Sequence, residues 1–337
     1  MVKLKRNVLL APYTTFGVGG LADYFLEVRN PEELVTAVRL AKKKSWPYFV
    51  IAGGSNVVFG DKPFRGLVIR YQIKNQRFDL KNPSRSNLIS CQGRTLTCDL
   101  TCEAGVPLER LIKKAISSGL AGLEALSGIP GTVGGAIVGN AGAYGQTISD
   151  HLVRVEVFAP RLLDAARPRG RTASGVRWLT KKQCRFAYRT SIFKEKKGED
   201  WLVLRAEFKL KKGDKKALTK KSREIIKIRS EKYSPTLLCP GSFFKNVLVR
   251  GMSRVALAKG DKQKIINGKI PAGYLLEEVG AKGRRVGGIY VADFHGNLLI
   301  NDGHGTCRNV VTLAAKLKKL VQKKFGIILE EEVRYML

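Results

Sequence analysis

The stretch GIPGTVGGAIVGNAGAYG, residues 128–145, decides what kind of fold this chain can adopt. Seven of its eighteen residues are glycine, far above the average usage of about 7%. It also carries Ile129, Val133, Ile137 and Val138, whereas a flexible loop is usually more polar. Because glycine has no Cβ, its backbone allows a ligand to pack closely. We therefore favour a wall for a long, flat or phosphorylated ligand over a flexible loop, and expect neither a good helix nor a good strand here.

A second glycine turn lies upstream, where an apolar strand expected over residues 48–52 runs into Gly53, Gly54, Ser55 and Asn56. Consecutive glycines expose backbone N–H groups that can surround a phosphate or pyrophosphate, and the two polar side chains add donors. The turn matches neither GxGxxG nor GxxxxGK[ST]. An ordinary tight turn and a phosphate site both remain open at this point.

Two charged features suggest chemistry. Arg189 lies among apolar neighbours in FAYRTSIF, residues 186–193. A buried arginine is costly unless paired, and its planar fork suits a carboxylate; a surface arginine with a structural partner is the alternative. Near the C-terminus, a strand expected over residues 327–334 would place Glu330 and Glu332 on one face. A solvated acidic terminus is the alternative there.

The remaining pattern is a mixture of helices and short strands. Asn30 and Pro31 begin a helix well, with Glu32 and Glu33 near its positive end. Further helices are expected over residues 107–118, 217–232, 272–279 and 309–325, and a pair of strands over 284–301.

Composition limits the class of protein. No window approaches eighteen consecutive apolar residues, and the apolar stretch after the basic N-terminus is too short for a signal peptide. We therefore expect a protein that stays in the cytoplasm. The six cysteines and three histidines have no metal-ligand spacing, so no metal is expected.

Charge is the unusual feature, because 61 Lys and Arg against 28 Asp and Glu give a net charge of +33. The lysine runs are dispersed over the whole chain rather than gathered in one stripe. General surface charge and a polyanion partner are both compatible with that pattern, and we favour the former.

These motifs, together with GSFFKN at residues 241–246, resemble the UDP-N-acetylenolpyruvoylglucosamine reductase family. The match runs in order along nearly the whole chain, from YTTFGVGG at 13–20 through YRTS at 188–191 and HGNLLIN at 295–301 to LEEEVR at 329–334. The short segment before the helix expected from residue 217 is similar to the subgroup that lacks an extra substrate-capping loop with its tyrosine. Val247 departs from the family, which commonly has proline there.

The resemblance implies an α+β chain. Its fold would be a two-lobed FAD-binding fold of the vanillyl-alcohol-oxidase (PCMH) type plus a C-terminal α+β substrate-binding domain. We place the FAD-binding lobes at residues 1–70 and 71–212 and the substrate-binding domain at 213–325. The terminal strand, 326–337, would return to the first lobe.

The resemblance also implies an activity, the NADPH-dependent reduction of the enolpyruvyl group of UDP-N-acetylglucosamine enolpyruvate. The product would be UDP-N-acetylmuramate, a peptidoglycan precursor used in cell-wall synthesis. The cofactor would be FAD, with NADPH as reducing cosubstrate. Beyond NADPH and the UDP-sugar we expect no membrane and no specific nucleic-acid partner, and we expect a monomer.

By motif match, Arg189, Ser242 and Glu332 take the catalytic places. Arg189 can bind the substrate carboxylate, and Glu332 can hydrogen-bond it if the glutamate is protonated or shares a proton. Hydride adds to C3 of the enolpyruvyl group, and Ser242 can deliver a proton to C2 if a cation such as Lys245 lowers its pKa.

The same match assigns the binding residues. The cofactor-binding set is Gly53, Gly54, Ser55, Asn56, Gly128, Thr132, Gly135, Asn140, Gly142, Tyr144, Arg229 and Arg334. The substrate-binding set is Tyr188, Lys232, Asn246 and His295, of which Lys232 and Asn246 would hold the UDP diphosphate.

Two alternatives remain. Another FAD enzyme of the same fold, acting on a small alcohol, would explain the glycine segments but not the set formed by Ser242, Glu332 and Lys232. A basic nucleic-acid-binding protein that kept a degenerate enzyme fold would show one focused basic face and an affinity that falls steeply with salt.

Overall fold

The chain forms two compact units in a computed structural model. The structure describes residues 3–73, 78–81, 97–160, 175–234, 236–250 and 264–337. Unit 1 contains Phe25–Gly53 and Leu67–Arg229, and unit 2 contains Lys5–Tyr24, Gly54–Gly66 and Ser230–Leu337. Among the described helices, none has the length and apolar character needed to span a membrane. The proposed division into three domains stays a prediction.

Unit 1 is built around a mainly antiparallel sheet of order β12-β11-β13-β7-β6, with the short β8 paired to the end of β13. Along β13, Ala206, Phe208 and Leu210 are buried while Lys209 and Lys211 are exposed. This alternation is typical of a sheet with one face on the core. The strands are β6 (Phe78–Lys81), β7 (Thr97–Glu103), β8 (Leu120–Ala121), β11 (Leu152–Phe158), β12 (Val176–Thr180) and β13 (Leu202–Lys212).

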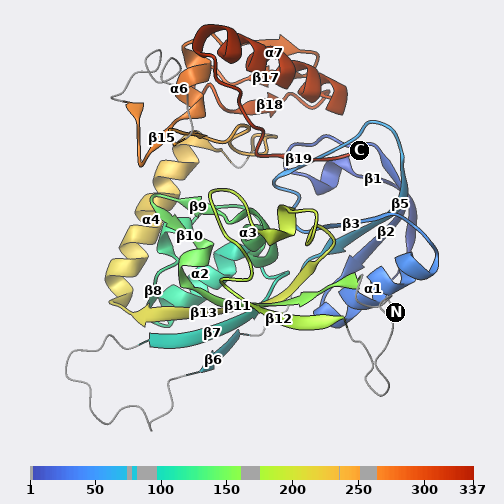
Figure 1. Cartoon of the computed structure of the whole chain (residues 1–337), viewed down its shortest axis with the longest axis vertical. Helices are drawn as coiled ribbons and strands as arrows, with labels where there is room; N and C mark the ends of the chain where they lie inside the picture. Colours follow the sequence, from blue (N-terminus) through green and yellow to red (C-terminus); the bar gives the residue numbers. More distant parts are fainter. Residues whose placement is uncertain (1–2, 74–77, 82–96, 161–174, 235, 251–263) are drawn as a thin grey trace. The chain divides into compact units, whose positions relative to one another are not determined.

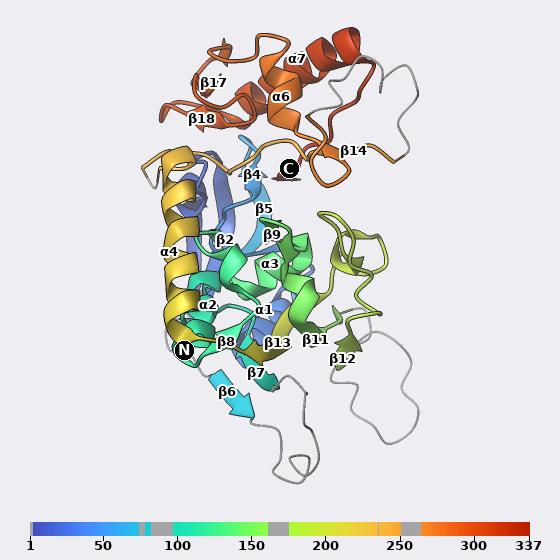
Figure 2. The ribbon, with the colours of Figure 1, turned by 90° about the vertical axis from the view of Figure 1, so that its left-hand side faces the viewer.

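The buried face of this sheet is covered by α2 (Leu108–Ser117) and α3 (Val133–Gly139), as both ribbon views show (Figure 1, Figure 2). A longer helix, α4 (Lys215–Lys232), is tied to the segment before α3 by a 2.8 Å hydrogen bond between the hydroxyls of Ser127 and Ser222. The glycine-rich stretch is therefore part of a packed layer rather than a flexible loop.

The prediction that residues 128–145 hold no good helix is wrong, because α3 forms within them. Glycine disfavours helix by about 1 kcal/mol per residue. Here the Thr132 hydroxyl caps the first turn, and Val133, Ala136 and Ile137 are buried. Tertiary packing thus outweighs propensity.

The N-terminal helix is predicted correctly. It is α1 (Pro31–Lys43), capped by Asn30, whose side chain accepts a 2.8 Å hydrogen bond from the Glu33 N–H. The neighbouring strands are β1 (Lys5–Leu9), β2 (Leu21–Val28), β3 (Tyr48–Ile51) and β5 (Phe64–Tyr71), in the order β1-β2-β5-β3 with β3 and β5 parallel.

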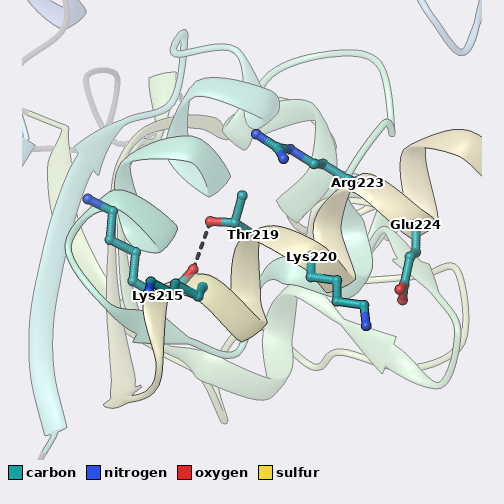
Figure 3. A pocket seen from close by; sticks show the side chains of 6 residues that line it. Lys215, Thr219, Lys220, Arg223 and Glu224 are labelled. Carbon is teal, nitrogen blue, oxygen red and sulfur yellow. Dashed lines mark hydrogen bonds between the residues drawn. The ribbon is translucent and has the colours of Figure 1, made fainter.

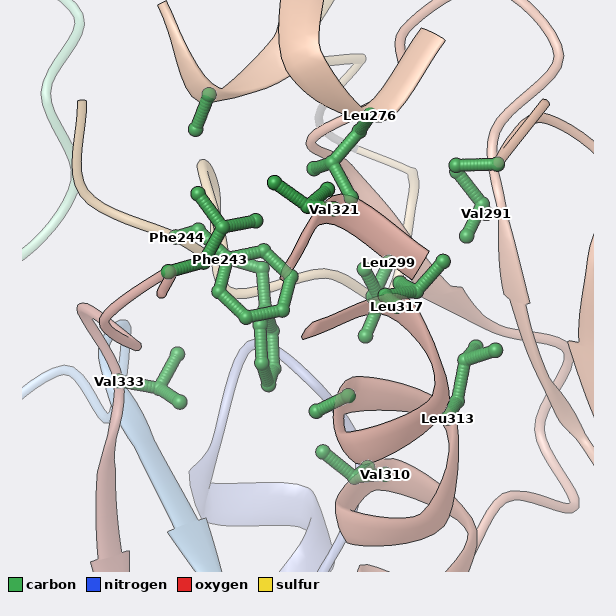
Figure 4. Packing of buried hydrophobic residues seen from close by; sticks show 14 of the residues in the cluster. Phe243, Phe244, Leu276, Val291, Leu299, Val310, Leu313, Leu317, Val321 and Val333 are labelled. Atoms are coloured by element: carbon green, nitrogen blue, oxygen red, sulfur yellow. The ribbon is translucent and has the colours of Figure 1, made fainter. Parts of the chain in front are cut away.

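Unit 2 packs α6 (Ala272–Glu277) and α7 (Cys307–Phe325) with a three-stranded sheet, β16 (Arg285–Val286), β17 (Ile289–Val291) and β18 (Leu299–Asn301). Its core contains the rings of Phe243 and Phe244, which meet edge to face with centroids 5.1 Å apart. Figure 4 shows these rings beside the apolar stripe of α7. That stripe lies within the helix predicted over residues 309–325 and has the three- and four-residue spacing of an amphipathic helix: Val310, Leu313, Ala314, Leu317 and Val321.

The C-terminal segment differs from the prediction of a strand over residues 327–334. The terminal strand is β19 (Arg334–Met336), which runs parallel to β4 (Val57–Phe59). Residues 327–333 are irregular except for a single bridge between Glu331 and Phe244. The remaining short strands are β9 (Gly142–Ala143), β10 (Gln146–Thr147), β14 (Val247–Leu248) and β15 (Lys269–Ile270).

Leu317→Ala should lower the free energy of unfolding by about 2–5 kcal/mol, because the fully buried side chain leaves a cavity. Val311→Ala, on the exposed side of the same helix, should change it by no more than about 0.5 kcal/mol. Urea unfolding followed by circular dichroism measures both variants. Equal effects would contradict the packing of α7 described above.

Candidate active site

The two glycine segments meet within unit 1. A Cβ built on Gly53, at the end of the turn that follows β3, would lie 3.4 Å from the Cα of Gly131. At the start of α3 the Gly135 N–H donates to the Thr132 hydroxyl at 3.3 Å. The two glycine turns are thus neighbours within unit 1, and the ligand wall that the sequence predicts there stays a prediction.

Asn140 ends α3 in a left-handed conformation, with φ of 44°. Its side chain is 5% exposed, and its Nδ2 donates to the Ala187 carbonyl at 2.9 Å. Within the described residues, Asn140 Oδ1 is buried without a hydrogen-bond partner. A buried acceptor of this kind is costly unless a donor reaches it, so this position suits a ligand with an N–H or O–H group. Farther along, Tyr144 is 53% exposed, at φ of 48°.

Arg189 lies on a tight turn with φ of 55°. The backbones of Ala187 and Thr190 hydrogen-bond each other in both directions, at 3.1 and 3.2 Å. The buried Ser191 hydroxyl donates to the Val138 carbonyl at 2.7 Å. Together with the Asn140 bond, these contacts fasten the arginine turn to α3.

The guanidinium of Arg189 lies 5.9 Å from the ring centroid of Tyr188, and the arginine is half-buried. Its own carbonyl accepts from Lys194 Nζ at 3.0 Å. Within unit 1 the structure thus brings together two sequence features 50 residues apart, the glycine wall and the arginine with its tyrosine neighbour.

Arg229 lies across Gly128. A Cβ on Gly128, whose φ is 75°, would lie 3.3 Å from the Arg229 Cδ. The helix that carries Arg229 is anchored further by an ion pair of 2.9 Å between Lys221 and the buried Glu124. Lys232 is the last residue of α4, and its side chain lies outside the described residues.

A hollow of about 530 Å³ on α4 contains none of the predicted site residues. Figure 3 shows side chains of the first half of that helix around it. The hollow is lined by Lys215, Lys216, Thr219, Lys220, Arg223 and Glu224. It is a feature of the basic surface rather than of the predicted site.

In unit 2, backbone hydrogen bonds hold the run that carries Ser242 against the segment that carries Glu332. Ser242 pairs with Leu298, and the following Phe243 carbonyl accepts a hydrogen bond from the Glu332 N–H at 2.8 Å. The Glu332 carbonyl accepts from Asn56 Nδ2 at 3.0 Å, within the segment that follows Gly54. The unit therefore gathers residues from three parts of the sequence.

Arg334 is held in the same way, since its N–H donates to the Asn56 carbonyl at 3.0 Å. Gly54 has φ of 63°, and a Cβ there would overlap the carbonyl oxygen of Tyr13. Only glycine fits this turn without strain. The second predicted cofactor turn, including Ser55, is thus shaped by backbone contacts inside unit 2.

The side chains around Ser242 differ from the prediction. Its hydroxyl lies 3.0 Å from that of Tyr233, which sequence analysis did not select. Lys245, expected to act on Ser242, instead pairs with Glu330 at 2.9 Å. An aromatic residue nine positions before the serine was too weak a signal to find Tyr233.

Asn246 and His295 have structural contacts of their own. Asn246 Oδ1 accepts from the Ala272 N–H at 3.1 Å, at the start of α6. His295 Nδ1 accepts from the Asn297 N–H at 3.2 Å. Burial alone would raise the pKa of the nearby Glu277. Hydrogen bonds from the Gly296 N–H and from Lys282, together with the charges of Lys282 and His295, outweigh burial and hold that pKa below its ordinary value.

Burial also raises the pKa of the Cys239 thiol. This thiol lies three residues before Ser242, and its raised pKa keeps it protonated at neutral pH. Only a thiolate is nucleophilic. It is therefore not a competing nucleophile beside the serine.

Comparison with known proteins decides the family. Residues 235–336 match the model of the UDP-N-acetylenolpyruvoylglucosamine reductase C-terminal domain, and residues 22–161 match an FAD binding domain. A relative from Solibacter usitatus, named UDP-N-acetylenolpyruvoylglucosamine reductase, is 40% identical over 97% of this chain and 95% of its own length. The chain belongs to the UDP-N-acetylenolpyruvoylglucosamine reductase family.

Other relatives agree with the UDP-N-acetylenolpyruvoylglucosamine reductase assignment. A protein of the same name from Carboxydothermus hydrogenoformans is 36% identical over 97% of this chain and 93% of its own length. The crystal structure of UDP-N-acetylenolpyruvylglucosamine reductase from Thermus caldophilus is 29% identical, with a TM-score of 0.70 over the whole of both chains. The predicted family and fold class, an FAD-binding α+β fold followed by a C-terminal α+β domain, are confirmed.

Gly54→Ala should destabilise the protein by more than about 2 kcal/mol, because a left-handed alanine is strained and its Cβ overlaps the Tyr13 backbone. Gly60→Ala is the matched control, since a Cβ there makes ordinary contacts of 3.5 Å with Leu337. The thermal midpoint of each variant and its FAD content after purification test this expectation. A Gly54→Ala protein as stable and as yellow as the control would contradict it.

Proposed function

We propose that this chain is an NADPH-dependent flavoenzyme that reduces the enolpyruvyl group of UDP-N-acetylglucosamine enolpyruvate to give UDP-N-acetylmuramate. Membership of the reductase family over the full chain supports the reaction. The structural observation that carries the proposal is the backbone pairing that holds the run with Ser242 against the segment with Glu332 within unit 2. A flavoenzyme that oxidises a small alcohol would leave the set formed by Ser242, Glu332 and Lys232 unexplained.

The glycine wall fits FAD. Gly53 and Gly131 lie side by side and are both partly exposed. The buried Asn140 Oδ1 offers an acceptor to a hydrogen-bond donor of the cofactor. We propose that the cofactor-binding residues assigned by motif hold it, with Arg229 and Arg334 contributing positive charge. When bound, FAD takes a hydride from NADPH and supplies it to C3 of the enolpyruvyl group.

Arg189 is proposed to bind the carboxylate of the enolpyruvyl group. Its turn is fastened to α3, so the guanidinium is presented by a rigid support rather than by a free loop. A fixed positive fork stabilises the negative charge that develops on the carboxylate as hydride adds. Tyr188 lies beside it as a further substrate contact.

Ser242 is proposed to give the proton that C2 requires, and Glu332 to hydrogen-bond the substrate carboxylate. The carbonyl and N–H of Glu332 are both held by backbone or amide partners, which fixes where its side chain begins. Positioned groups of this kind typically contribute about 10²- to 10⁴-fold to a proton transfer.

The remaining assignments concern the nucleotide part of the substrate and the setting of the enzyme. Lys232 and Asn246 are proposed to hold the UDP diphosphate, with His295 nearby. We further propose a cytoplasmic monomer that has no membrane partner and no specific nucleic-acid partner. The dispersed surface cations, which repel one another between copies, support a single copy over an assembly.

The purified protein should be yellow and should oxidise NADPH only when the UDP-enolpyruvyl sugar is present. Absorbance near the flavin band and NADPH consumption, with and without the sugar, test this directly. A colourless preparation that cannot be reconstituted with FAD would sink the proposal.

Ser242→Ala should still allow the bound flavin to be reduced by NADPH but should slow turnover of the sugar by at least about 100-fold, because the proton donor is lost. Stopped-flow absorbance separates the two steps. Ser117→Ala, on an exposed helix position far along the chain, is the control. Near-normal sugar turnover in Ser242→Ala would remove the serine from this role.

A further inference from the structure

The hydroxyl of Tyr233 is the side-chain group within hydrogen-bond reach of Ser242 in the described residues, at 3.0 Å. We propose that Tyr233 is a positioning residue for the proton donor: it orients the Ser242 hydroxyl toward the substrate and returns a proton to it after each transfer. This inference rests on the proposed function and deepens it by one residue that the motifs do not assign.

Tyr233 is held in place by unit 2 itself. Its ring packs, partly buried, against the cluster formed by Ala292, Leu298 and Ile300. It also lies beside the His295 ring, with centroids 6.3 Å apart. Leu298 is the residue that pairs with Ser242. Leu298 therefore both pairs with the serine backbone and packs in the cluster that supports the tyrosine ring, so the two hydroxyls share one support.

A serine that gives up a proton needs such a neighbour. The alkoxide left on Oγ must be stabilised by a donor, because an unpaired charge in a half-buried site is costly. Lys245, the nearest cation in sequence, is paired with Glu330. The Tyr233 hydroxyl oxygen lies 3.0 Å from Oγ, and a phenol is a stronger acid than an aliphatic alcohol.

The proton balance of the step is simple. The Ser242 O–H bond breaks as its proton forms the new C–H bond at C2 of the substrate. The Tyr233 O–H then donates to the serine Oγ and passes its proton there, so that serine is restored. The phenolate regains a proton from solvent before the next turnover, and no electrons are exchanged by either residue.

Tyr233→Phe keeps the ring and its packing but removes the hydroxyl. The variant should be reduced by NADPH at the normal rate, while the step with the UDP-enolpyruvyl sugar slows about 10- to 100-fold, the effect of losing a hydrogen bond to a charged group. We expect kcat to fall with little change in KM for the sugar. The slowing caused by D₂O on the sugar step should increase. Tyr290→Phe, which packs against the same cluster, is the matched control and should behave as the original protein.

The Ser242→Ala background gives an independent check. If Tyr233 acts through Ser242, adding Tyr233→Phe to Ser242→Ala should produce no further slowing. Additive losses, a normal sugar step in Tyr233→Phe, or equal slowing of both half-reactions would each overturn the inference. If the original protein itself fails to turn over the sugar, the proposed function fails instead, so the two failures are distinguishable.

Discussion

The candidate site in unit 2 depends on one set of backbone hydrogen bonds. The irregular segment before β19 lies between the run that carries Ser242 and the residue Asn56. Within it, the Glu332 N–H donates to the Phe243 carbonyl, and the Glu332 carbonyl accepts from the Asn56 side chain. A regular strand here would satisfy its backbone within one ladder. The irregular course instead lets three distant pieces of chain share their partners. The two buried rings of Phe243 and Phe244 then fix the serine run against the core, so the position of the Ser242 hydroxyl follows from packing.

In unit 1 the corresponding constraint is close approach of backbone to backbone. The ligand wall over residues 128–145 stays a prediction. The sequence did argue against a flexible loop there, because apolar side chains interleaved with glycine are unusual in loops. It was not sufficient to predict α3, whose formation depends on a cap by Thr132 and on burial of Val133 and Ile137 against the sheet. Nor did it show that the Arg189 turn is fastened to that helix, since the Ser191 and Asn140 contacts join residues about 50 positions apart.

Local signals explain which predictions succeeded. The start of α1 and the apolar stripe of α7 depend on residues that are close together in the sequence, so the two helices were predicted closely. The family and its chemistry follow from motifs along the whole chain. The side chain that contacts the Ser242 hydroxyl could not be predicted in this way. Lys245 is close in sequence but pairs with Glu330, while Tyr233 contacts the serine hydroxyl through the fold of unit 2.

The most direct test is amide hydrogen exchange in the protein without substrate, measured at Glu332 and also at Lys245 and Arg334. Each of the three N–H groups donates to a backbone carbonyl at 2.8–3.0 Å. We predict that all three exchange far more slowly than in an unstructured peptide, because the pairing exists before substrate arrives. Exchange of the Glu332 amide at the rate of an unstructured peptide would contradict the claim that this pairing holds the run with Ser242 against the segment with Glu332.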